Sequence, residues 1–360
     1  MTISLCMIVK NEADVLRRAL GNCGAFADEI IVTDTGSNDG TERIASELGA
    51  TVFDFQWIDD FSAARNFCIS KASGDYYMWL DADDVVPEST ASAIARLKRT
   101  LDPSVDIVML PYVLSRDERG KPLFSYYRER IVKNRPDFYF KGRVHEAVPL
   151  HGNIVRLPHE IEHAKPKTRM GGSRNLEIYK KMLADGAKLE PRERYYYARE
   201  LFYNGYFSDA SDEFERFLRC GNGYLPNKID ACVMLSRCHR ERGDTVKALS
   251  ALYGSFVYGL PTGEACCELG YVYFSSGDYK SAAYWFERAT HSKPDKDSGA
   301  FVDTDCYGFL PYVWLTVCYD RLGQPRAAYY YHCRARRIKP NHPSVTANQK
   351  YFSSLGFSAE

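Results

Sequence analysis

The first half of the chain alternates short apolar runs with polar segments of helical pattern. The apolar runs are rich in Ile, Val, Phe and Tyr, a composition typical of buried strands. They span residues 3–9, 29–33, 51–55 and 76–80. The helical patterns between them cover residues 12–22, 41–48 and 63–71. This alternation with short loops predicts a parallel-type sheet covered by helices, in which ligands bind beyond the carboxyl ends of the strands.

Beyond residue 190 the pattern becomes purely helical and repeats itself. Four segments share a glycine at a turn, an alanine five residues after it, and aromatic or apolar residues at helical spacing. The turn glycines are Gly205, Gly243, Gly277 and Gly323, at spacings of 38, 34 and 46 residues. The spacing of 34 equals the period of tetratricopeptide repeats, whose helix pairs stack on their neighbours. A generic helical bundle is the alternative.

The third of these segments matches the tetratricopeptide template most fully. The matching residues are Leu269, Gly270, Tyr273, Ala282, Phe286, Ala289 and Pro294. Small residues in this template let two helices approach, and large residues fill the seam between neighbouring repeats. The insertion before the fourth segment, around residues 295–305, is predicted to be a loop.

These patterns predict a Rossmann-like α/β domain followed by an all-α repeat domain. For a chain of 360 residues, two domains of roughly 150 residues each are expected. We place the α/β domain at residues 1–165, a linker and first helix at 166–190, and the repeats at 191–345. Residues 346–360 are left as a C-terminal tail.

Charge and cysteine content exclude several classes of protein. Lys and Arg together number 47, as do Asp and Glu, so no basic excess points to nucleic acid. The 11 cysteines form no CxxC pair, which is typical of reduced thiols in the cytoplasm. The apolar start, residues 1–9, lacks a basic region and is ended by Lys10, unlike a signal peptide. No run approaches the roughly 20 apolar residues of a membrane span, so we expect a cytoplasmic protein.

An acidic cluster, Asp81-Ala82-Asp83-Asp84, directly follows the last of the four apolar runs. Carboxylates crowded at a strand end repel one another, so a divalent cation is expected to neutralise them. Mg²⁺ or Mn²⁺ there would also bridge to a nucleotide diphosphate. The structural alternative is a solvated loop or a helix N-cap, because Asp84 and Glu88 lie where the next helix begins.

Two further residues are candidates for contacts with a nucleotide. Asp34 ends the second strand, where a carboxylate can accept a hydrogen bond from a base N–H. Arg65 lies on the helix that leads to the acidic cluster, and its guanidinium suits phosphates or planar bases. A plain turn for the loop after Asp34 and a surface position for Arg65 are the structural alternatives.

Five ordered motifs together resemble the family-2 glycosyltransferases, which have the GT-A fold. They are SLCMIVKNE at 4–12, IVTDTGSNDGT at 31–41, AARN at 63–66, ASGDYYMWLDADD at 72–84 and GRVHE at 142–146. The resemblance covers residues 3–165. It implies a GT-A nucleotide-sugar domain, a UDP-sugar donor, Mn²⁺ or Mg²⁺, and inversion at the anomeric carbon.

The resemblance also assigns residues to the donor site. The nucleotide-sugar-binding residues that it implies are Val9, Asn11, Glu12, Asp34, Arg65, Asp81 and Ala82. The backbone of Val9 and the side chain of Asp34 are expected at the uracil, with Arg65 near the base or the phosphates. Asp81 and Asp83 are expected to form the DxD pair. In that pair Asp83 binds the metal, and Asp81 binds the ribose or the metal.

On the acceptor side, the same resemblance points to residues 142–146. An inverting transfer needs a base that takes the acceptor proton, and Glu146 is the candidate, with His145 as its rival. The usual motif of the family reads Glu-Asp, whereas this chain has His-Glu. His163 matches a late histidine that often completes the metal shell, and a surface or capping histidine is the alternative.

A GT-A domain followed directly by tetratricopeptide-like helices is similar to the sublancin-type peptide S-glycosyltransferases. The landmarks are FSAARN at 61–66, LDADD at 80–84, FKGRVHE at 140–146 and YYYARELFYNG at 195–205. The similarity implies a peptide or protein acceptor, modified on Cys or Ser and held by the repeats. A thiol acceptor depends less on a strong base, which agrees with the His-Glu pair. The repeats also offer a surface for a homodimer.

Two other functions remain open. A cell-envelope glycosyltransferase of the lipopolysaccharide-core type shares the DxD and VHE landmarks. Such enzymes tend to carry basic or amphipathic membrane-docking surface, which a neutral chain does not favour. A non-catalytic scaffold would be expected to have a damaged DxD pair or to lack Arg65, and both are intact.

Overall fold

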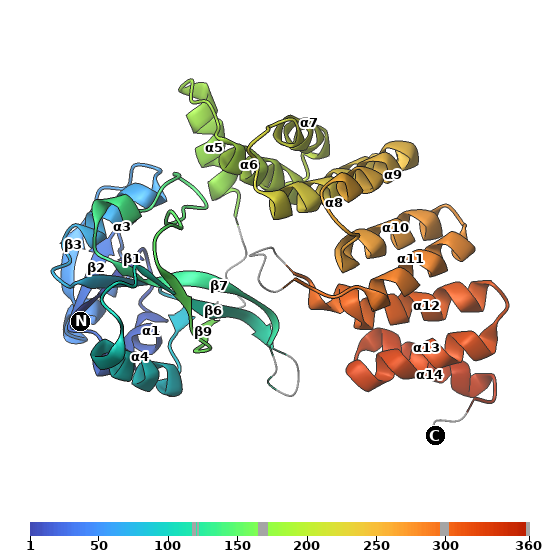
Figure 1. Cartoon of the computed structure of the whole chain (residues 1–360), viewed down its shortest axis with the longest axis horizontal. Helices are drawn as coiled ribbons and strands as arrows, with labels where there is room; N and C mark the ends of the chain where they lie inside the picture. The colour runs from blue at the N-terminus through green and yellow to red at the C-terminus, as the bar shows by residue number, and fades with distance from the viewer. Residues whose placement is uncertain (117–119, 121, 165–171, 296–301, 358–360) are drawn as a thin grey trace. The chain divides into compact units, whose positions relative to one another are not determined.

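The protein consists of two compact units, Met1–Lys188 and Leu189–Glu360 (Figure 1). The computed structural model describes residues 1–116, 120, 122–164, 172–295 and 302–357. The first unit holds a mixed sheet with helices, and the second unit is helical. The predicted fold class, a GT-A-like α/β domain followed by an all-α tetratricopeptide-like domain, is confirmed.

The four apolar runs form the parallel part of the sheet, in the order β3-β2-β1-β4. Their bounds are β1 Ile3–Val9, β2 Glu29–Asp34, β3 Thr51–Asp54 and β4 Tyr76–Leu80. Because all four run in the same direction, their carboxyl ends meet at one edge of the sheet. This part of the sheet was predicted from the sequence.

The rest of the sheet is antiparallel or mixed, so the parallel-type prediction holds only for the first four strands. The long strands β6 and β7 pair with each other and β7 pairs with β4, both antiparallel. Strands β8 and β9 are parallel to β6, and the two-residue β5 is antiparallel to β9. The bounds are β5 Asp84–Val85, β6 Ile107–Arg116, β7 Pro122–Lys133, β8 Ile154–Arg156 and β9 Ile161–His163.

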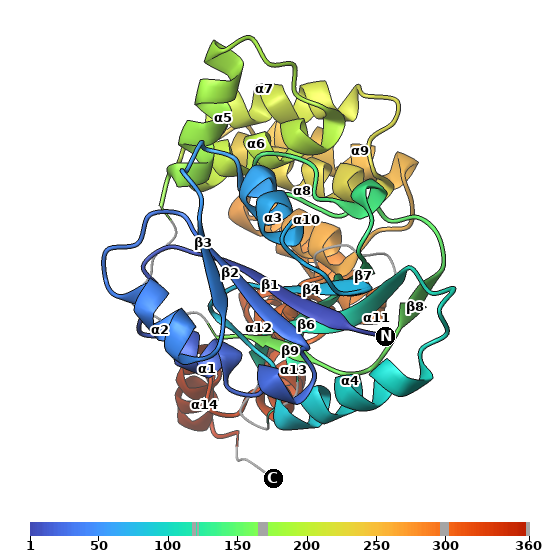
Figure 2. The same ribbon diagram turned by 90° about the vertical axis from the view of Figure 1, so that its left-hand side faces the viewer.

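Helices cover both faces of the parallel strands (Figure 2). Successive side chains of a strand point to opposite faces, so Leu5 and Met7 of β1 pack with α1 and α4, whereas Cys6 packs with α3. The helices are α1 Leu16–Leu20, α2 Thr41–Glu47, α3 Phe61–Ile69, α4 Glu88–Thr100 and α5 Arg174–Ala184, with short 3-10 turns η1 Cys23–Ala25 and η2 Pro136–Phe138.

The first helix is shorter than the predicted range of residues 12–22. Asn11 has a positive φ of 56°, which is incompatible with a helix. The next amide groups donate to side chains of the neighbouring loop instead, Glu12 N to Thr41 Oγ1 and Ala13 N to Asp39 Oδ2. These two amides, at the start of the predicted helix, therefore hold the loop after β1 in place and do not begin a helix.

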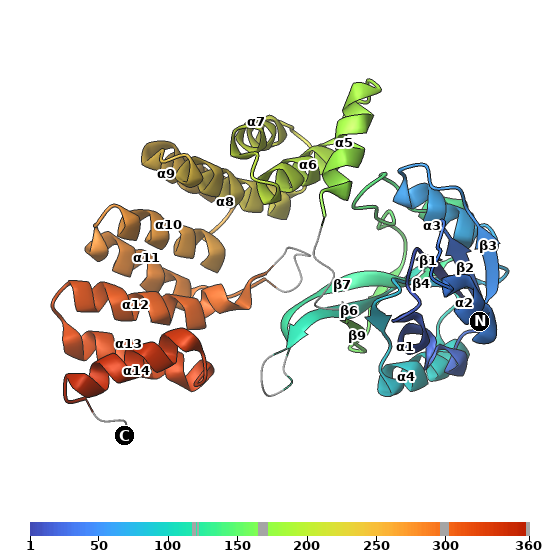
Figure 3. The ribbon, with the colours of Figure 1, turned by 180° about the vertical axis from the view of Figure 1, so that it is seen from behind.

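The second unit consists of four consecutive helical hairpins and a final helix (Figure 3). The hairpins are α6 Pro191–Tyr203 with α7 Phe207–Leu218, α8 Leu225–Glu241 with α9 Thr245–Gly254, α10 Gly263–Ser275 with α11 Tyr279–His291, and α12 Phe309–Arg321 with α13 Pro325–Ile338. The last helix, α14 Pro343–Ser354, occupies much of the segment predicted as a tail, and its Phe352 is fully buried. None of the helices in the described ranges is both long and apolar enough to cross a membrane.

The four turn glycines lie between the two helices of each hairpin. Their φ angles lie between 71° and 81°, the left-handed region that only glycine adopts at little cost. The predicted repeat register is therefore confirmed. The short η4, Thr304–Tyr307, begins at the end of the predicted insertion, and residues 296–301 of the insertion lie outside the described part. One further 3-10 turn, η3 Ser255–Val257, follows α9.

We expect Gly270→Ala to lower the free energy of unfolding by about 1–3 kcal/mol, the usual cost of overpacking a core. A Cβ at Gly270 would lie 2.6 Å from the ring of Phe286, which is itself fully buried between α10 and α11. The matched control is Gly254→Ala, because Gly254 has a helical φ of −59° and open space at its Cβ position. Urea unfolding followed by circular dichroism should show a lower midpoint for the first variant only.

Candidate functional site

A cavity of about 200 Å³ lies at the edge where the carboxyl ends of β1, β2 and β4 meet. Six of the predicted site residues line it: Val9, Glu12, Arg65, Asp81, Ala82 and Asp83. The remaining lining residues are Ile8, Lys10, Thr35, Trp57, Phe61 and Arg174. The cavity is where ligands bind in open sheets with parallel strands.

Arg65 joins two predicted site residues that are far apart in the sequence. Its Nε donates to Oε1 of Glu146 and its terminal nitrogen donates to Oδ1 of Asp81, both at 2.6 Å. Burial alone would lower the pKa of Arg65, but the charges of Asp81 and Glu146 raise it above the usual range. The guanidinium therefore stays charged and holds the candidate base beside the first carboxylate of the DxD pair.

Aromatic rings support this guanidinium. Arg65 lies 4.9 Å from the ring centre of Trp79 and 5.3 Å from that of Phe140. Two more guanidinium groups contact the same indole, Arg128 at 4.6 Å and Arg130 at 4.1 Å. An aromatic face attracts a cation. The indole of Trp79 is therefore in contact with three guanidinium groups next to the acidic cluster.

Glu146 lies on a loop whose backbone is closely constrained. Lys141 and Ala147 exchange backbone hydrogen bonds of 3.0 and 3.1 Å, which closes the loop at its base. His145 has a φ of 52°, an uncommon conformation for a residue with a side chain. Backbone strain of this kind persists only where the surroundings enforce it, and it is often found at functional sites.

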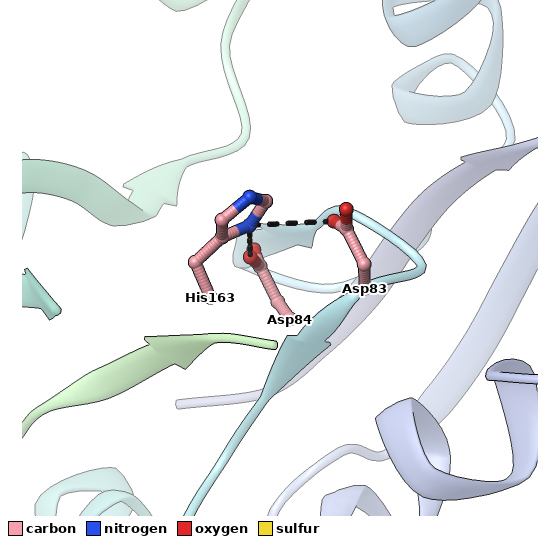
Figure 4. A group of neighbouring side chains, drawn as sticks. All are labelled: Asp83, Asp84 and His163. Atoms are coloured by element: carbon pink, nitrogen blue, oxygen red, sulfur yellow. Dashed lines mark ion pairs between the residues drawn. The ribbon is translucent and has the colours of Figure 1, made fainter. Parts of the chain in front are cut away.

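Asp83 and Asp84, the last two residues of the acidic cluster, lie close to His163 (Figure 4). Antiparallel pairing of β5 with β9 sets Asp84 opposite His163. Nδ1 of His163 lies 3.5 Å from Oδ1 of Asp83 and 3.7 Å from Oδ1 of Asp84. Carboxylate oxygens and an imidazole suit a divalent cation such as Mn²⁺. Asp81, predicted as a further ligand, pairs with Arg65, and its role as a ligand stays a prediction.

Asp84 is fully buried and belongs to a polar network. Arg130, also fully buried, lies 2.9 Å from its Oδ2, and the hydroxyl of Tyr112 donates to its Oδ1 at 2.7 Å. Burial would raise the pKa of Asp84, but the charge of Arg130 and the bonds from His163 and Tyr112 lower it to about 2. Asp84 is therefore neither a solvated loop residue nor a helix cap, because Pro87 occupies the cap of α4.

The same network orients His163. The hydroxyl oxygen of Tyr112 lies 2.7 Å from Nδ1 of His163. The same hydroxyl donates to Oδ1 of Asp84, so its oxygen can accept a proton carried on Nδ1 of His163. The pKa of His163 is raised by its bond to Asp84 and by the charge of Asp83, with burial opposing. The donor set fits a divalent cation.

Two predicted donor-site residues support the loop beside the cavity rather than line it. Oδ1 of Asp34 accepts from the amides of Gly36 and Ser37 at 2.9 and 2.7 Å, and its side chain is almost fully buried. Oδ1 of Asn11 accepts from the amide of Asn38 at 2.9 Å. The carbonyl of Val9 is likewise bonded, to the amide and hydroxyl of Thr35.

Sequence reasoning missed several residues of the site. Trp57 and Phe61 form an aromatic pair with centres 4.8 Å apart, and Arg174 of α5 lies 4.7 Å above Phe61. Arg130 was also missed, although a guanidinium just before the apolar pair Ile131-Val132 is an unusual signal in a buried strand. Tyr112 carried no such signal, because strands commonly contain tyrosine.

Comparison with known proteins identifies the first unit. Residues 4–152 match the family model "Glycosyl transferase family 2". This stretch includes all of the predicted site residues except His163. Over these residues the chain is therefore similar to the family-2 glycosyltransferases.

Two curated proteins are similar to parts of this chain. A TPR repeat-containing protein of Synechococcus elongatus is 42% identical over 147 residues, which are 41% of this chain and 35% of that protein. The SPbeta prophage-derived glycosyltransferase SunS of Bacillus subtilis is 29% identical over 268 residues, 68% of this chain and 60% of that protein. The chain thus spans about a third of the length of the Synechococcus protein and about three fifths of the length of SunS.

Among solved structures, glucosyl-3-phosphoglycerate synthase from Mycobacterium tuberculosis, in complex with Mn²⁺, UDP and phosphoglyceric acid, is 22% identical. The match covers 31% of this chain and 43% of that one, with a TM-score of 0.27. A TM-score this low gives no evidence for a shared substrate.

Proposed function

We propose that this protein is a metal-dependent, inverting glycosyltransferase that moves a hexose from a UDP-sugar to a peptide or protein Cys or Ser side chain. The observation that carries the proposal is the cavity at the end of β1, β2 and β4. Its lining includes Arg65, which pairs with Glu146, and Asp83, which lies beside His163. Both pairs belong to the unit that contains the family-2 domain.

Each side chain has a role that follows from its position. Asp83 and His163 would hold a Mn²⁺ or Mg²⁺ ion, which supplies positive charge to the diphosphate leaving group. Asp84 and Tyr112 orient His163, as their hydrogen bonds indicate. Glu146 takes the proton of the acceptor, and Arg65 keeps Glu146 and Asp81 at fixed positions. Trp57 and Phe61 give the donor cavity an apolar wall.

The peptide acceptor is supported by the combination of domains. The family-2 domain is followed by tetratricopeptide-like hairpins, and extended peptides commonly bind to helical repeats of this kind. The similarity to SunS extends over 68% of the chain, so it is longer than the family-2 domain alone. A saccharide acceptor of the cell-envelope type is the competing proposal, and no residue of the described site favours it.

Titration calorimetry with nucleotides tests the donor site. We expect UDP to bind in the presence of Mn²⁺, GDP to bind more weakly, and excess EDTA to remove UDP binding. Transfer is then assayed with UDP-sugars on matched peptides that contain Cys, Ser or Ala at one position. If neither nucleotide binds with or without metal, the glycosyltransferase proposal is wrong and a scaffold role takes its place.

We expect Glu146→Gln to slow transfer to a Ser peptide by about 10²-fold or more, because the amide cannot accept the proton. The amide oxygen can still accept from Arg65, so the site should keep its shape. The loss should be smaller for a Cys peptide, because a thiol is partly ionised without a base. Steady-state kinetics of both peptides measure this difference. His145→Gln is the matched variant, and a larger loss there than in Glu146→Gln would reassign the base.

A further inference from the structure

A second cavity, of about 600 Å³, lies within the repeat unit. It is formed by the first half of α8, the start of α10, the connecting residues 258–262 and the last turn of α11. Its volume is within the range of roughly 300–1,000 Å³ that is typical of specific ligand sites. The cavity is far larger than the donor cavity of the first unit.

The walls of this repeat cavity are largely apolar. Leu225, Ile229 and Val233 line it from α8, and Leu260 and Pro261 line it from the connecting segment. Two of these side chains are unusually open to solvent, Leu225 at 50% and Leu260 at 90% exposure. Large exposed apolar side chains that gather at one cavity indicate a surface that is covered by a ligand.

Five charged residues line the cavity, the acidic Asp230, Glu264 and Asp295 and the basic Arg288 and Lys293. Among the ion pairs of the described residues, none involves Arg288 or Lys293, which both line the cavity from the end of α11 and the residues after it. The acidic groups are already engaged. Asp230 accepts from Tyr195 and Arg199, and Glu264 accepts from Tyr307 at 2.7 Å.

The third acidic residue at this cavity, Asp295, also has a partner. Two cations are thus available to a ligand, whereas each carboxylate already has a hydrogen bond or another interaction within the protein. Arg288 and Lys293 can therefore pair with a carboxylate of a ligand. The apolar walls beside Arg288 and Lys293 favour an alkyl side chain next to that carboxylate.

We propose that the repeat cavity binds a peptide segment in which an apolar side chain adjoins a carboxylate. This proposal deepens the proposed function and rests on it, because the segment is part of the acceptor peptide. Leu225, Leu260 and their neighbours bury the apolar side chain, and Arg288 and Lys293 pair with the carboxylate. Binding at this cavity would retain the acceptor while its Cys or Ser reaches the transferase site.

Fluorescence anisotropy with the full chain tests the proposal. The probe is a fluorescein-labelled hexapeptide of alternating Leu and Glu with an amidated C-terminus. Two comparison peptides replace Glu by Lys or Leu by Ser. We expect the Leu-Glu peptide to bind at least about tenfold more tightly than either comparison peptide, because each lacks one of the two complementary groups.

A peptide of Leu and Ser with a free C-terminus distinguishes the source of the carboxylate. Binding of this peptide as tight as that of the Leu-Glu probe would show that the cavity accepts a C-terminal carboxylate as well as a side chain. Weaker binding would show that it takes an acidic side chain. Both results support the carboxylate site, and they define which ligand chemistry it prefers.

The variant Arg288→Ala/Lys293→Ala should weaken binding of the Leu-Glu probe at least about tenfold. Lys280→Ala, an exposed cation at the other end of α11, is the matched control and should bind as the wild type does. Equal binding of the Leu-Glu and Leu-Lys peptides would overturn the proposal, as would unchanged binding by the double variant.

Binding is measured without nucleotide or metal and is repeated in Asp83→Ala, so its outcome is independent of the donor site. If the probe binds but UDP does not, the proposal for the repeat cavity is supported and the transferase proposal fails. If UDP binds but the probe does not, the cavity proposal alone is wrong.

Discussion

Asp83→Ala is expected to reduce kcat for sugar transfer by about 10³-fold or more while both units stay folded. Asp83 is the member of the acidic cluster that both lines the donor cavity and lies 3.5 Å from His163. Its side chain is 20% exposed, so its carboxylate is open to the cavity, unlike that of Asp84. In the proposed mechanism its removal deletes a metal ligand, and with it the charge that would stabilise the leaving diphosphate.

Calorimetric titration of Mn²⁺ in the presence of UDP measures the same loss without relying on turnover. The matched control is Asp137→Ala, an exposed carboxylate of the same unit that pairs with Arg135 at the surface. This control should keep both activity and metal binding. Full activity of Asp83→Ala, or of the wild type in excess EDTA, would rule out a metal-dependent mechanism.

Asp84→Ala is expected to lower the free energy of unfolding of the first unit by about 3–5 kcal/mol. Asp84 and Arg130 are both fully buried, and the ion pair joins β5 to β7. Two other nitrogens of Arg130 have no hydrogen-bond partner, so the loss of Asp84 leaves a buried cation with only the carbonyl of Trp79 as an acceptor. An uncompensated buried charge costs far more than a lost surface contact.

The double variant Asp84→Leu/Arg130→Met separates this cost from the loss of packing. It removes both charges, so we expect it to be more stable than Asp84→Ala alone. Glu47→Ala, which breaks exposed pairs with Arg17 and Arg43, should leave stability nearly unchanged. Hydrogen exchange of the β4 and β7 amides measures the stability of the first unit separately from that of the second. Equal protection in Asp84→Ala and the wild type would contradict the expected role of the pair.

Much of the fold was determined by local patterns in the sequence. The continuous apolar run Tyr76–Leu80 is compatible with a strand buried on both faces, and all five of its residues are buried. The turn glycines of the repeats, such as Gly243 and Gly277, lie where the register predicted them and have positive φ. Periodicity and turn chemistry act over a few residues, so they can be read without knowledge of distant contacts.

The sequence indicated which residues belong to the candidate site, but it did not indicate which of their side chains contact one another. Asp81, Asp83 and Arg65 could be named as candidates because strand ends and motif order are local features, and all three line the cavity. The sequence could not show that Arg65 bridges Asp81 to Glu146, which is 81 positions away. Nor could it show that Asp84 turns inward to Arg130, since neighbouring acidic residues have the same composition whichever way they point.

The sequence by itself thus determined the four parallel strands, the helical repeats and the residue types at the candidate site. Only the tertiary structure decided the mixed half of the sheet, the shortened α1 and the division of the acidic cluster among three partners, Arg65, His163 and Arg130. The physical reason is the same in each case. Strand pairing between β5 and β9, and burial of Asp84 against Arg130, depend on segments brought together by folding. Their energies arise from long-range contacts that no local pattern encodes.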